Sequence, residues 1–151
     1  MPLNTQPYFS CDLDLLILQE SQSGNRSYLH SFDDRSDCIY DVAWSPTHPA
    51  LFASVDCGGH LDLWNFNVDT EVPVVSALVD SGAHALNKLR WNANGTQIAV
   101  GDYHGRVHLY DIGEQIATPR PDEWSRFMRS LSELRSMQQE EEEARMIARQ
   151  L

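Results

Sequence analysis

Two stretches of the chain carry the same pattern of hydrophobic and polar positions. The first is LFASVDCGGHLDLWNF (residues 51–66) and the second is QIAVGDYHGRVHLYDI (residues 97–112), so the copies are offset by 46 residues. Each copy has a short apolar run, an Asp-x-x-Gly turn and a strand in which apolar and polar residues alternate. Short apolar runs are typical of strands inside a sheet, and alternation is typical of half-buried strands. The pattern therefore predicts a β-hairpin in each copy.

The turn residues explain why the hairpin recurs. Asp56 and Asp102 can accept backbone N–H hydrogen bonds across the turn, and Gly59 and Gly105 can adopt a positive φ where a Cβ atom would clash. The final strand carries aliphatic residues on one face in both copies, namely Leu61 and Leu63, then Val107 and Leu109. We expect the residues between them, Asp62 and His108, to face outward.

A second similarity lies upstream of each hairpin. IYDVAWSP (residues 39–46) aligns with LNKLRWNA (residues 86–93), which places Trp44 opposite Trp91. Apolar residues recur there at strand spacing, and turns rich in Pro, Gly and Asn follow. Each copy therefore has three predicted strands, with room for a fourth. We assign the two repeats to residues 28–66 and 77–112.

After the second repeat the chain changes character. Residues 113–120 are interpreted as a linker, and residues 121–151 as a C-terminal amphipathic helix that begins at Pro121. The stripe that recurs at helical spacing consists of Trp124, Phe127, Met128, Leu131 and Leu134. This stripe should be buried, either on the chain's own sheets or on a separate protein. Gln138 and Glu141 interrupt the heptad, which argues against a continuous coiled coil.

Composition narrows the classes of partner. The 151 residues include 22 acidic and 11 basic residues, a formal net charge of −11, which disfavours binding to a nucleic-acid backbone. The three cysteines (Cys11, Cys38 and Cys57) form no C-x-x-C pair, so neither a disulfide framework nor a zinc site is predicted, and a reducing compartment fits best. The longest apolar run, residues 15–18, is far too short to span a bilayer. We predict a cytosolic protein without membrane insertion.

Candidate catalytic or metal-binding residues have a simpler interpretation in the repeat. Asp102, His104 and His108 could form a metal or acid–base cluster, but the repeat explains Asp102 as a turn residue and His108 as the counterpart of Asp62. Cys57 and His60 lie on the equivalent turn of the first copy. The sequence therefore predicts no catalytic, cofactor-binding or metal-binding residue, and no small-molecule substrate.

Together these motifs resemble the WD40 repeat, in which an Asp-x-x-Gly turn is followed by an aliphatic strand ending in Trp and Asp; here the endings are LWN and LYD. The resemblance implies a mainly β fold, a partial WD40 β-propeller of about two to three blades, followed by a C-terminal α-helix. The structural repeat positions would be Trp44, Asp56, Gly59, Trp64, Trp91, Asp102, Gly105 and Tyr110. Residues 1–27 match no repeat, although DLDLLILQ could supply a strand of a preceding blade. The family's Gly-His dipeptide is replaced by Asp34-Arg35 and Ser81-Gly82.

A more specific resemblance covers residues 31–128. The segments YDVAWSPTHPALFASVD, ALNKLRWN and DEWSRF are similar to the C-terminal part of the cytoplasmic dynein intermediate chains. That family implies a non-catalytic scaffold subunit of the cytoplasmic, microtubule-associated dynein motor complex, which binds the dynein heavy chain and other dynein subunits and needs no cofactor. No part of this sequence matches the family's N-terminal region, which binds dynein light chains and dynactin. The alternative is a WD40 adaptor of another cytosolic complex.

Overall fold

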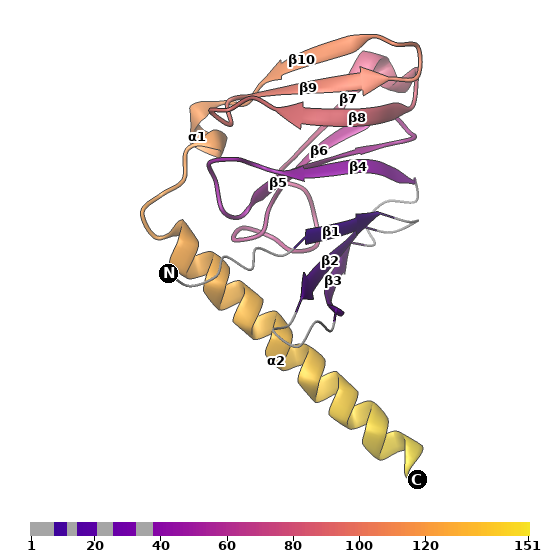
Figure 1. Cartoon of the computed structure of the whole chain (residues 1–151), viewed down its shortest axis with the longest axis vertical. Helices are drawn as coiled ribbons and strands as arrows, with labels where there is room; N and C mark the ends of the chain where they lie inside the picture. Colours follow the sequence, from indigo (N-terminus) through magenta and orange to yellow (C-terminus); the bar gives the residue numbers. More distant parts are fainter. Residues whose placement is uncertain (1–7, 12–14, 21–25, 33–37) are drawn as a thin grey trace.

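The computed structural model describes residues 8–11, 15–20, 26–32 and 38–151, the first three ranges by their backbone. It contains three antiparallel sheets, which Figure 1 shows stacked one above another. The first sheet contains β1 (Tyr8–Cys11), β2 (Leu15–Glu20) and β3 (Arg26–Phe32). The second contains β4 (Ile39–Trp44), β5 (Leu51–Asp56), β6 (His60–Asn65) and β7 (Val75–Leu78). The third contains β8 (Leu86–Trp91), β9 (Gln97–Asp102) and β10 (Val107–Asp111).

Both predicted hairpins are present, and they have the same register. In the second sheet Val55 pairs with Leu61, and in the third sheet Gly101 pairs with Val107, 46 residues later in each strand. The fourth strand for which the sequence left room is β7, which pairs with β6. The third sheet has only three strands in the described part of the chain. The mainly β prediction with repeated blades is therefore confirmed.

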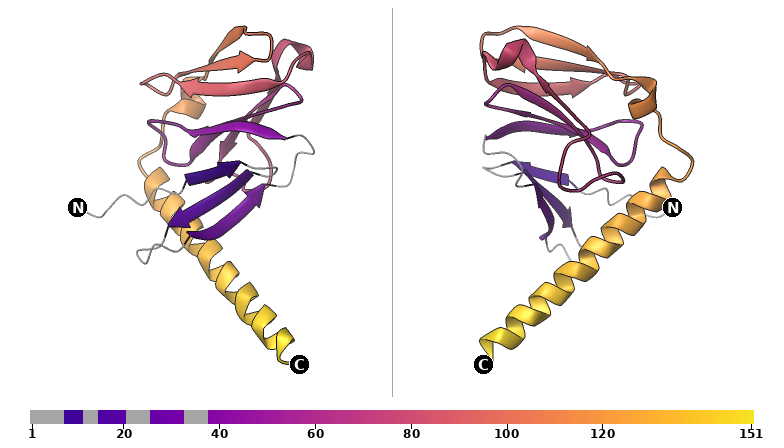
Figure 2. Two further views of the ribbon diagram at one scale, coloured as in Figure 1. Left: turned by 45° about the vertical axis from the view of Figure 1, so that its right-hand side comes forward. Right: turned by 180° about the vertical axis from the view of Figure 1, so that it is seen from behind.

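The second and third sheets pack face to face, and Figure 2 shows the first sheet on the other side of the second sheet. β4 and β5 lie against β8, and β1 lies against β4. The core between the second and third sheets is aliphatic and includes Val55, Leu61, Leu63, Leu89, Ile98 and Val100. Asp62, expected to face outward, is buried because neighbouring elements cover both faces of the second sheet. That expectation was therefore wrong.

The remaining elements lie between the sheets or after them. A short 3-10 helix, η1 (Val79–Gly82), joins β7 to β8, and the segment interpreted as a linker contains α1 (Glu114–Ala117). The long helix α2 (Glu123–Arg149) runs past the first sheet, and its C-terminal half projects away from all three sheets in Figure 1. Residues 139–151 are exposed throughout. The amphipathic character of α2 is therefore confined to its first half.

The two turn glycines offer a matched test of the repeat. Gly59 and Gly105 have φ values of +83° and +81°, in the left-handed region. A Cβ atom on Gly59 would lie 2.8 Å from the Cα of Gly82, whereas one on Gly105 would meet no atom within 4 Å. We expect Gly105→Ala to lower the free energy of unfolding by about 1–2 kcal/mol through backbone strain alone. Gly59→Ala should cost more, because the backbone near Gly82 must also move. Equal losses in urea denaturation would contradict this explanation.

Candidate functional site

The first half of α2 docks on the second sheet through an aromatic cluster. Phe127 and Leu131 are buried there, and Leu134 packs against the same cluster. The ring of Phe127 meets Trp44 and Phe66 edge to face, each at a centroid distance of 5.8 Å. The cluster also contains Ile39, Ala50, Phe52 and Trp64. Such edge-to-face pairs add to the burial of apolar area, so this contact fixes the helix on the blade.

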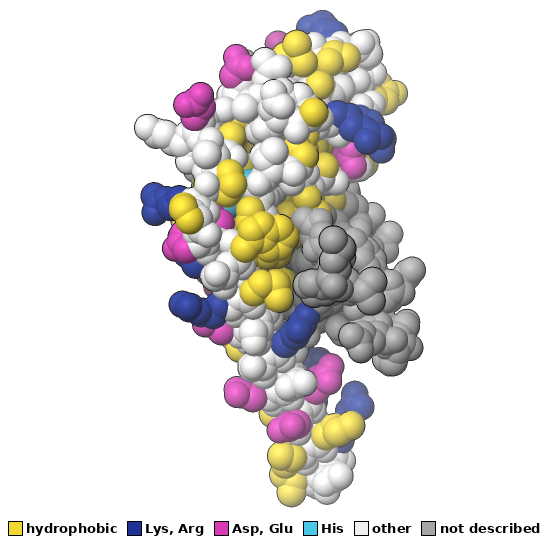
Figure 3. All heavy atoms as spheres, turned by 60° about the vertical axis from the view of Figure 1, so that its left-hand side comes forward, with side chains coloured by type: hydrophobic (Ala, Val, Ile, Leu, Met, Phe, Trp, Pro, Cys, Tyr) yellow, Lys and Arg dark blue, Asp and Glu magenta, His cyan; other side chains and the backbone are white. Residues whose placement is uncertain are grey.

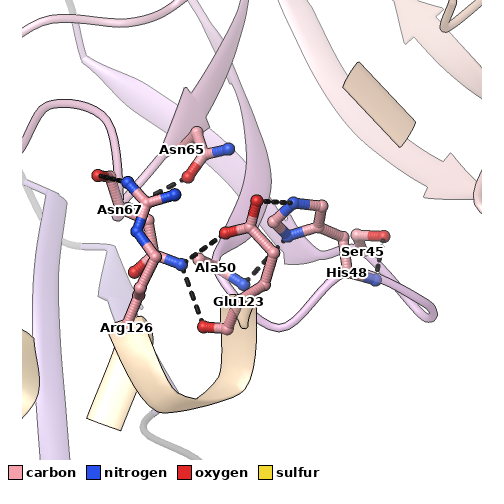
Figure 4. A network of polar contacts seen from close by, with 7 residues as sticks. All are labelled: Ser45, His48, Ala50, Asn65, Asn67, Glu123 and Arg126. Carbon is pink, nitrogen blue, oxygen red and sulfur yellow. Dashed lines mark hydrogen bonds and ion pairs between the residues drawn. The ribbon is translucent and has the colours of Figure 1, made fainter. Parts of the chain in front are cut away.

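A polar network fixes the start of the helix (Figure 4). Glu123, which is buried, accepts a hydrogen bond at its Oε2 from Asn67 Nδ2 at 2.6 Å, and its backbone carbonyl accepts one from the same nitrogen at 3.0 Å. Arg126 Nη2 in turn donates to the backbone carbonyl of Asn67 at 3.1 Å. Asn67 follows β6, so two residues of α2 form hydrogen bonds with the loop after that strand. Charge-assisted hydrogen bonds to a buried carboxylate are among the stronger polar contacts in proteins.

His48 closes this network from the β4–β5 loop. Its Nδ1 accepts a hydrogen bond from the backbone N–H of Ala50 at 3.2 Å, so we assign the proton of the neutral ring to Nε2. Nε2 lies 3.7 Å from Glu123 Oε1. Burial lowers the pKa of His48, and the nearby charge of Glu123 opposes that shift. Folding therefore disfavours protonation of this ring.

This histidine should make the docking sensitive to acid. An unfolded histidine gains a proton near its ordinary pKa of 6.5, whereas folded His48 does so only at a lower pH. The unfolded state therefore binds more protons in that interval, and stability present above pH 6.5 is lost as the pH falls, by at most about 1.4 kcal/mol per pH unit. We expect His48→Asn, which keeps an acceptor for Ala50, to flatten the dependence between about pH 7 and pH 5.5. Parallel curves for the two proteins would contradict this expectation.

Each repeat turn is held by a carboxylate and a histidine. Asp56 Oδ2 lies 3.0 Å from His60 Nδ1, and Asp102 Oδ2 lies 2.9 Å from His108 Nε2. The hydrogen bond with His108, with further ones from the backbone N–H groups of Arg106 and His104, holds the pKa of Asp102 at about 2. The stability from this carboxylate is present above its ordinary pKa and is lost as the pH falls from about 4 to about 2.

These pairs depart from the sequence expectation. His108 does not face outward, because its ring turns back to the buried carboxylate of Asp102. In both blades the histidine follows the aspartate in the same hairpin, four residues later in one and six in the other. Among the described residues no group of three or more His, Cys, Asp or Glu side chains could hold a metal ion. The geometry of both pairs is that of a turn-stabilising hydrogen bond.

The aromatic residues at the other repeat positions form hydrogen bonds or pack within and between the sheets. Buried Trp64 donates its Nε1–H to Ser54 Oγ at 3.0 Å within the second sheet. Trp91 donates to the backbone carbonyl of Ala43 at 3.1 Å and thereby links the third sheet to the second. Tyr110 packs at the edge of the aliphatic core between these sheets. Asp41, which the sequence did not single out, adds a second link, because its Oδ2 accepts a hydrogen bond from the backbone N–H of Leu89 at 3.0 Å.

The remaining residues of the predicted helical stripe lie at the surface. Trp124 is 51% exposed and Met128 is 55% exposed, so the chain's own sheets bury only part of the predicted stripe. They stand four residues apart on α2 and therefore lie side by side along the helix. Figure 3 shows hydrophobic side chains gathered on this face, near the start of the helix. We call Trp124 and Met128 the helix patch.

The chain shares sequence with a known protein. No protein-family model matches the chain. A cytoplasmic dynein 1 intermediate chain of Drosophila melanogaster is 53% identical to it over 113 residues, which are 75% of this chain and 17% of that protein. The chain thus spans less than a fifth of the relative's length. This identity confirms the resemblance that the sequence motifs indicated.

The fold also has a counterpart among solved structures. It is similar to the crystal structure of the Cps50 (Swd1) β-propeller domain of Myceliophteria thermophila, with a TM-score of 0.61 and 10% sequence identity. The similarity covers 76% of this chain and 38% of that chain. At such low identity it shows the fold alone, which is that of propeller blades. Within the described residues, no helix has the length and apolar character needed to cross a membrane.

Proposed function

We propose that this chain, a homologue of a cytoplasmic dynein intermediate chain, is a non-catalytic scaffold subunit of the cytoplasmic dynein motor complex. Its blades would contribute to binding the dynein heavy chain in microtubule-based transport. The observation that carries this proposal is the 53% identity over 113 residues. Other dynein subunits would be further partners, and the site of action would be the cytoplasm and its microtubules.

The helix patch supports a role in binding another protein. Exposed tryptophan and methionine are enriched in protein–protein interfaces, and truncating a central tryptophan often weakens a complex strongly. Trp124 and Met128 are held in place by the docking of Phe127 and Leu131 beneath them. A rigid apolar surface loses little conformational entropy when a partner covers it. We therefore include the helix patch in the surface that binds the heavy chain.

Capture of the heavy chain tests the proposal. The tagged chain should co-purify with the dynein heavy chain from a cell extract, and a Trp124→Ala, Met128→Ala double variant should bind at least about tenfold more weakly. Met146→Ala is the control, because Met146 is also exposed, at 69%, but lies on the projecting half of α2. Thermal melting of each variant separates a lost contact from a lost fold.

The outcomes of this capture distinguish the two candidate functions. Retention of the heavy chain by the native protein and by Met146→Ala, but not by the double variant, supports both the proposal and the helix patch. Retention by all three proteins places the interface elsewhere on the blades. Capture of a different cytosolic complex, with no heavy chain, would indicate the alternative function of a WD40 adaptor.

A further inference from the structure

Two cysteines that are far apart in the sequence lie opposite each other in the second sheet. Cys38 directly precedes β4, and Cys57 directly follows β5. These strands pair antiparallel with Ile39 opposite Asp56, so the next pair outward is Cys38 and Cys57. The backbone N–H of Cys57 donates a hydrogen bond to the carbonyl of Cys38 at 3.0 Å. This hydrogen bond joins the two cysteines directly beyond the ends of β4 and β5.

The spacing of such a pair suits a covalent link. Directly opposed residues in an antiparallel ladder project their side chains to the same face, and hydrogen-bonded pairs have Cα atoms about 5.5 Å apart. Disulfides join residues whose Cα atoms are about 4.4–6.8 Å apart. Both residues carry thiols and both are partly exposed, so a small oxidant can reach them.

We propose that Cys38 and Cys57 form a reversible cross-strand disulfide by exchange with a small-molecule disulfide such as oxidised glutathione. The thiolate of one cysteine attacks a sulfur of the oxidised glutathione, forms a mixed disulfide and releases one glutathione thiolate. The thiolate of the second cysteine then attacks the protein sulfur of that mixed disulfide and releases the second glutathione. The two cysteine sulfurs are oxidised, glutathione disulfide is reduced to two glutathiones, and the two cysteine protons pass to solvent or to the released thiolates.

The same geometry makes this link labile. Cβ atoms of opposed residues are about 4.5–5.5 Å apart and lie at the long end in hydrogen-bonded pairs, whereas a disulfide needs about 3.5–4.5 Å. Closing the link therefore draws the two strand ends together at some cost in strain. Strained, accessible disulfides have more oxidising potentials than structural ones and are reduced more readily. The link should remain open in a reducing environment and close when the glutathione pool becomes oxidised.

Formation of the disulfide would affect the second sheet, on which α2 docks. The loop between the two cysteines contains β4 and β5, whose Trp44 and Phe52 belong to the aromatic cluster around Phe127. A crosslink at the base of this hairpin restricts the unfolded chain and opposes separation of the two strands. The oxidised form should therefore melt at a higher temperature than the reduced form.

Equilibration with glutathione buffers of increasing oxidation tests the proposal. The intact mass of the full chain should fall by two hydrogens, and peptide mapping without reduction should join the peptides that contain Cys38 and Cys57. The melting temperature should rise with the mass change, and dithiothreitol should reverse both changes. Cys11→Ser is the matched control, because it removes the third thiol and should leave the crosslink unchanged. Cys57→Ser and Cys38→Ser should each abolish it.

Several results would overturn the proposal, and the mapping of the native protein reveals each of them without any variant. These are a crosslink that contains Cys11, a disulfide between two copies of the chain, and mixed disulfides with glutathione that do not resolve. An unchanged mass in the most oxidising buffer would also overturn it. Because none of these measurements involves the heavy chain, their result does not depend on the proposed function.

Discussion

Replacing Phe127 with alanine is expected to lower the free energy of unfolding by about 3–5 kcal/mol. Phe127 is almost completely buried, and its ring contacts both Trp44 and Phe66. Removing it would leave a cavity between α2 and the second sheet and would deprive the remaining rings of edge-to-face partners. Denaturant unfolding followed by tryptophan fluorescence would measure the loss directly, since Trp44 lies beside the substituted position.

Met128→Ala is the neighbouring control. Met128 follows Phe127 in the helix but is more than half exposed, so its truncation should cost less than about 1 kcal/mol. Trp124→Ala should fall between the two, because Trp124 is about half exposed but its ring lies edge to face with Phe127 at 6.3 Å. Equal losses for Phe127→Ala and Met128→Ala would show that helix content, and not the docked face, decides the stability.

The sequence predicted the helix stripe but not which part of it meets the sheet. At about 100° per residue, Phe127, Leu131 and Leu134 fall within an arc of about 60°, and Trp124 and Met128 lie to one side of it. Only that arc joins the aromatic cluster on the second sheet. Periodicity identifies apolar positions on a helix, but the width of the surface beneath it is a property of the assembled blades.

Local turn chemistry was the most predictable part of the fold. Gly59 and Gly105 have the positive φ that the Asp-x-x-Gly pattern requires, and both aspartates accept the backbone hydrogen bonds expected of them. These features depend on residues within a few positions of one another. They could therefore be derived from the sequence without knowledge of how the blades pack.

Features that join distant segments could not be predicted in the same way. Glu123 is favourable at a helix N-terminus for a local reason, but its partner Asn67 is 56 residues away, and only the path of the chain brings them together. The opposition of Cys38 and Cys57 likewise depends on the pairing of β4 with β5. A search for closely spaced cysteines does not find such a pair.

In the described part of the chain, one face of the third sheet is exposed, although the equivalent face of the second sheet is covered by the third. Leu61 and Leu63 of the second sheet are 3% and 5% exposed, because the third sheet packs over them. Their counterparts Val107 and Leu109 are 69% and 74% exposed. The same positions of one repeat are therefore buried in one blade and open to solvent in the next.

This contrast leads to the prediction for the chain on its own. In repeat arrays, much of the stability comes from interfaces between neighbouring units, and the matched propeller domain contains far more chain than the 38% covered here. We expect the purified 151-residue chain to be only marginally stable and to associate through its exposed sheet faces. Its elution volume and melting temperature should then depend on protein concentration.

A polar substitution of the open face should separate association from folding. The double variant Val107→Thr, Leu109→Thr keeps residues that suit a strand but removes most of the exposed aliphatic surface, so it should elute as a monomer with little change in stability. Leu61→Thr, at the buried counterpart, should instead lower the free energy of unfolding by about 2 kcal/mol or more, because it removes aliphatic contacts from the core between two sheets. If size-exclusion chromatography finds the native chain monomeric, with a sharp melting transition that does not vary with concentration, these blades are self-sufficient and the explanation from the uncovered face is wrong.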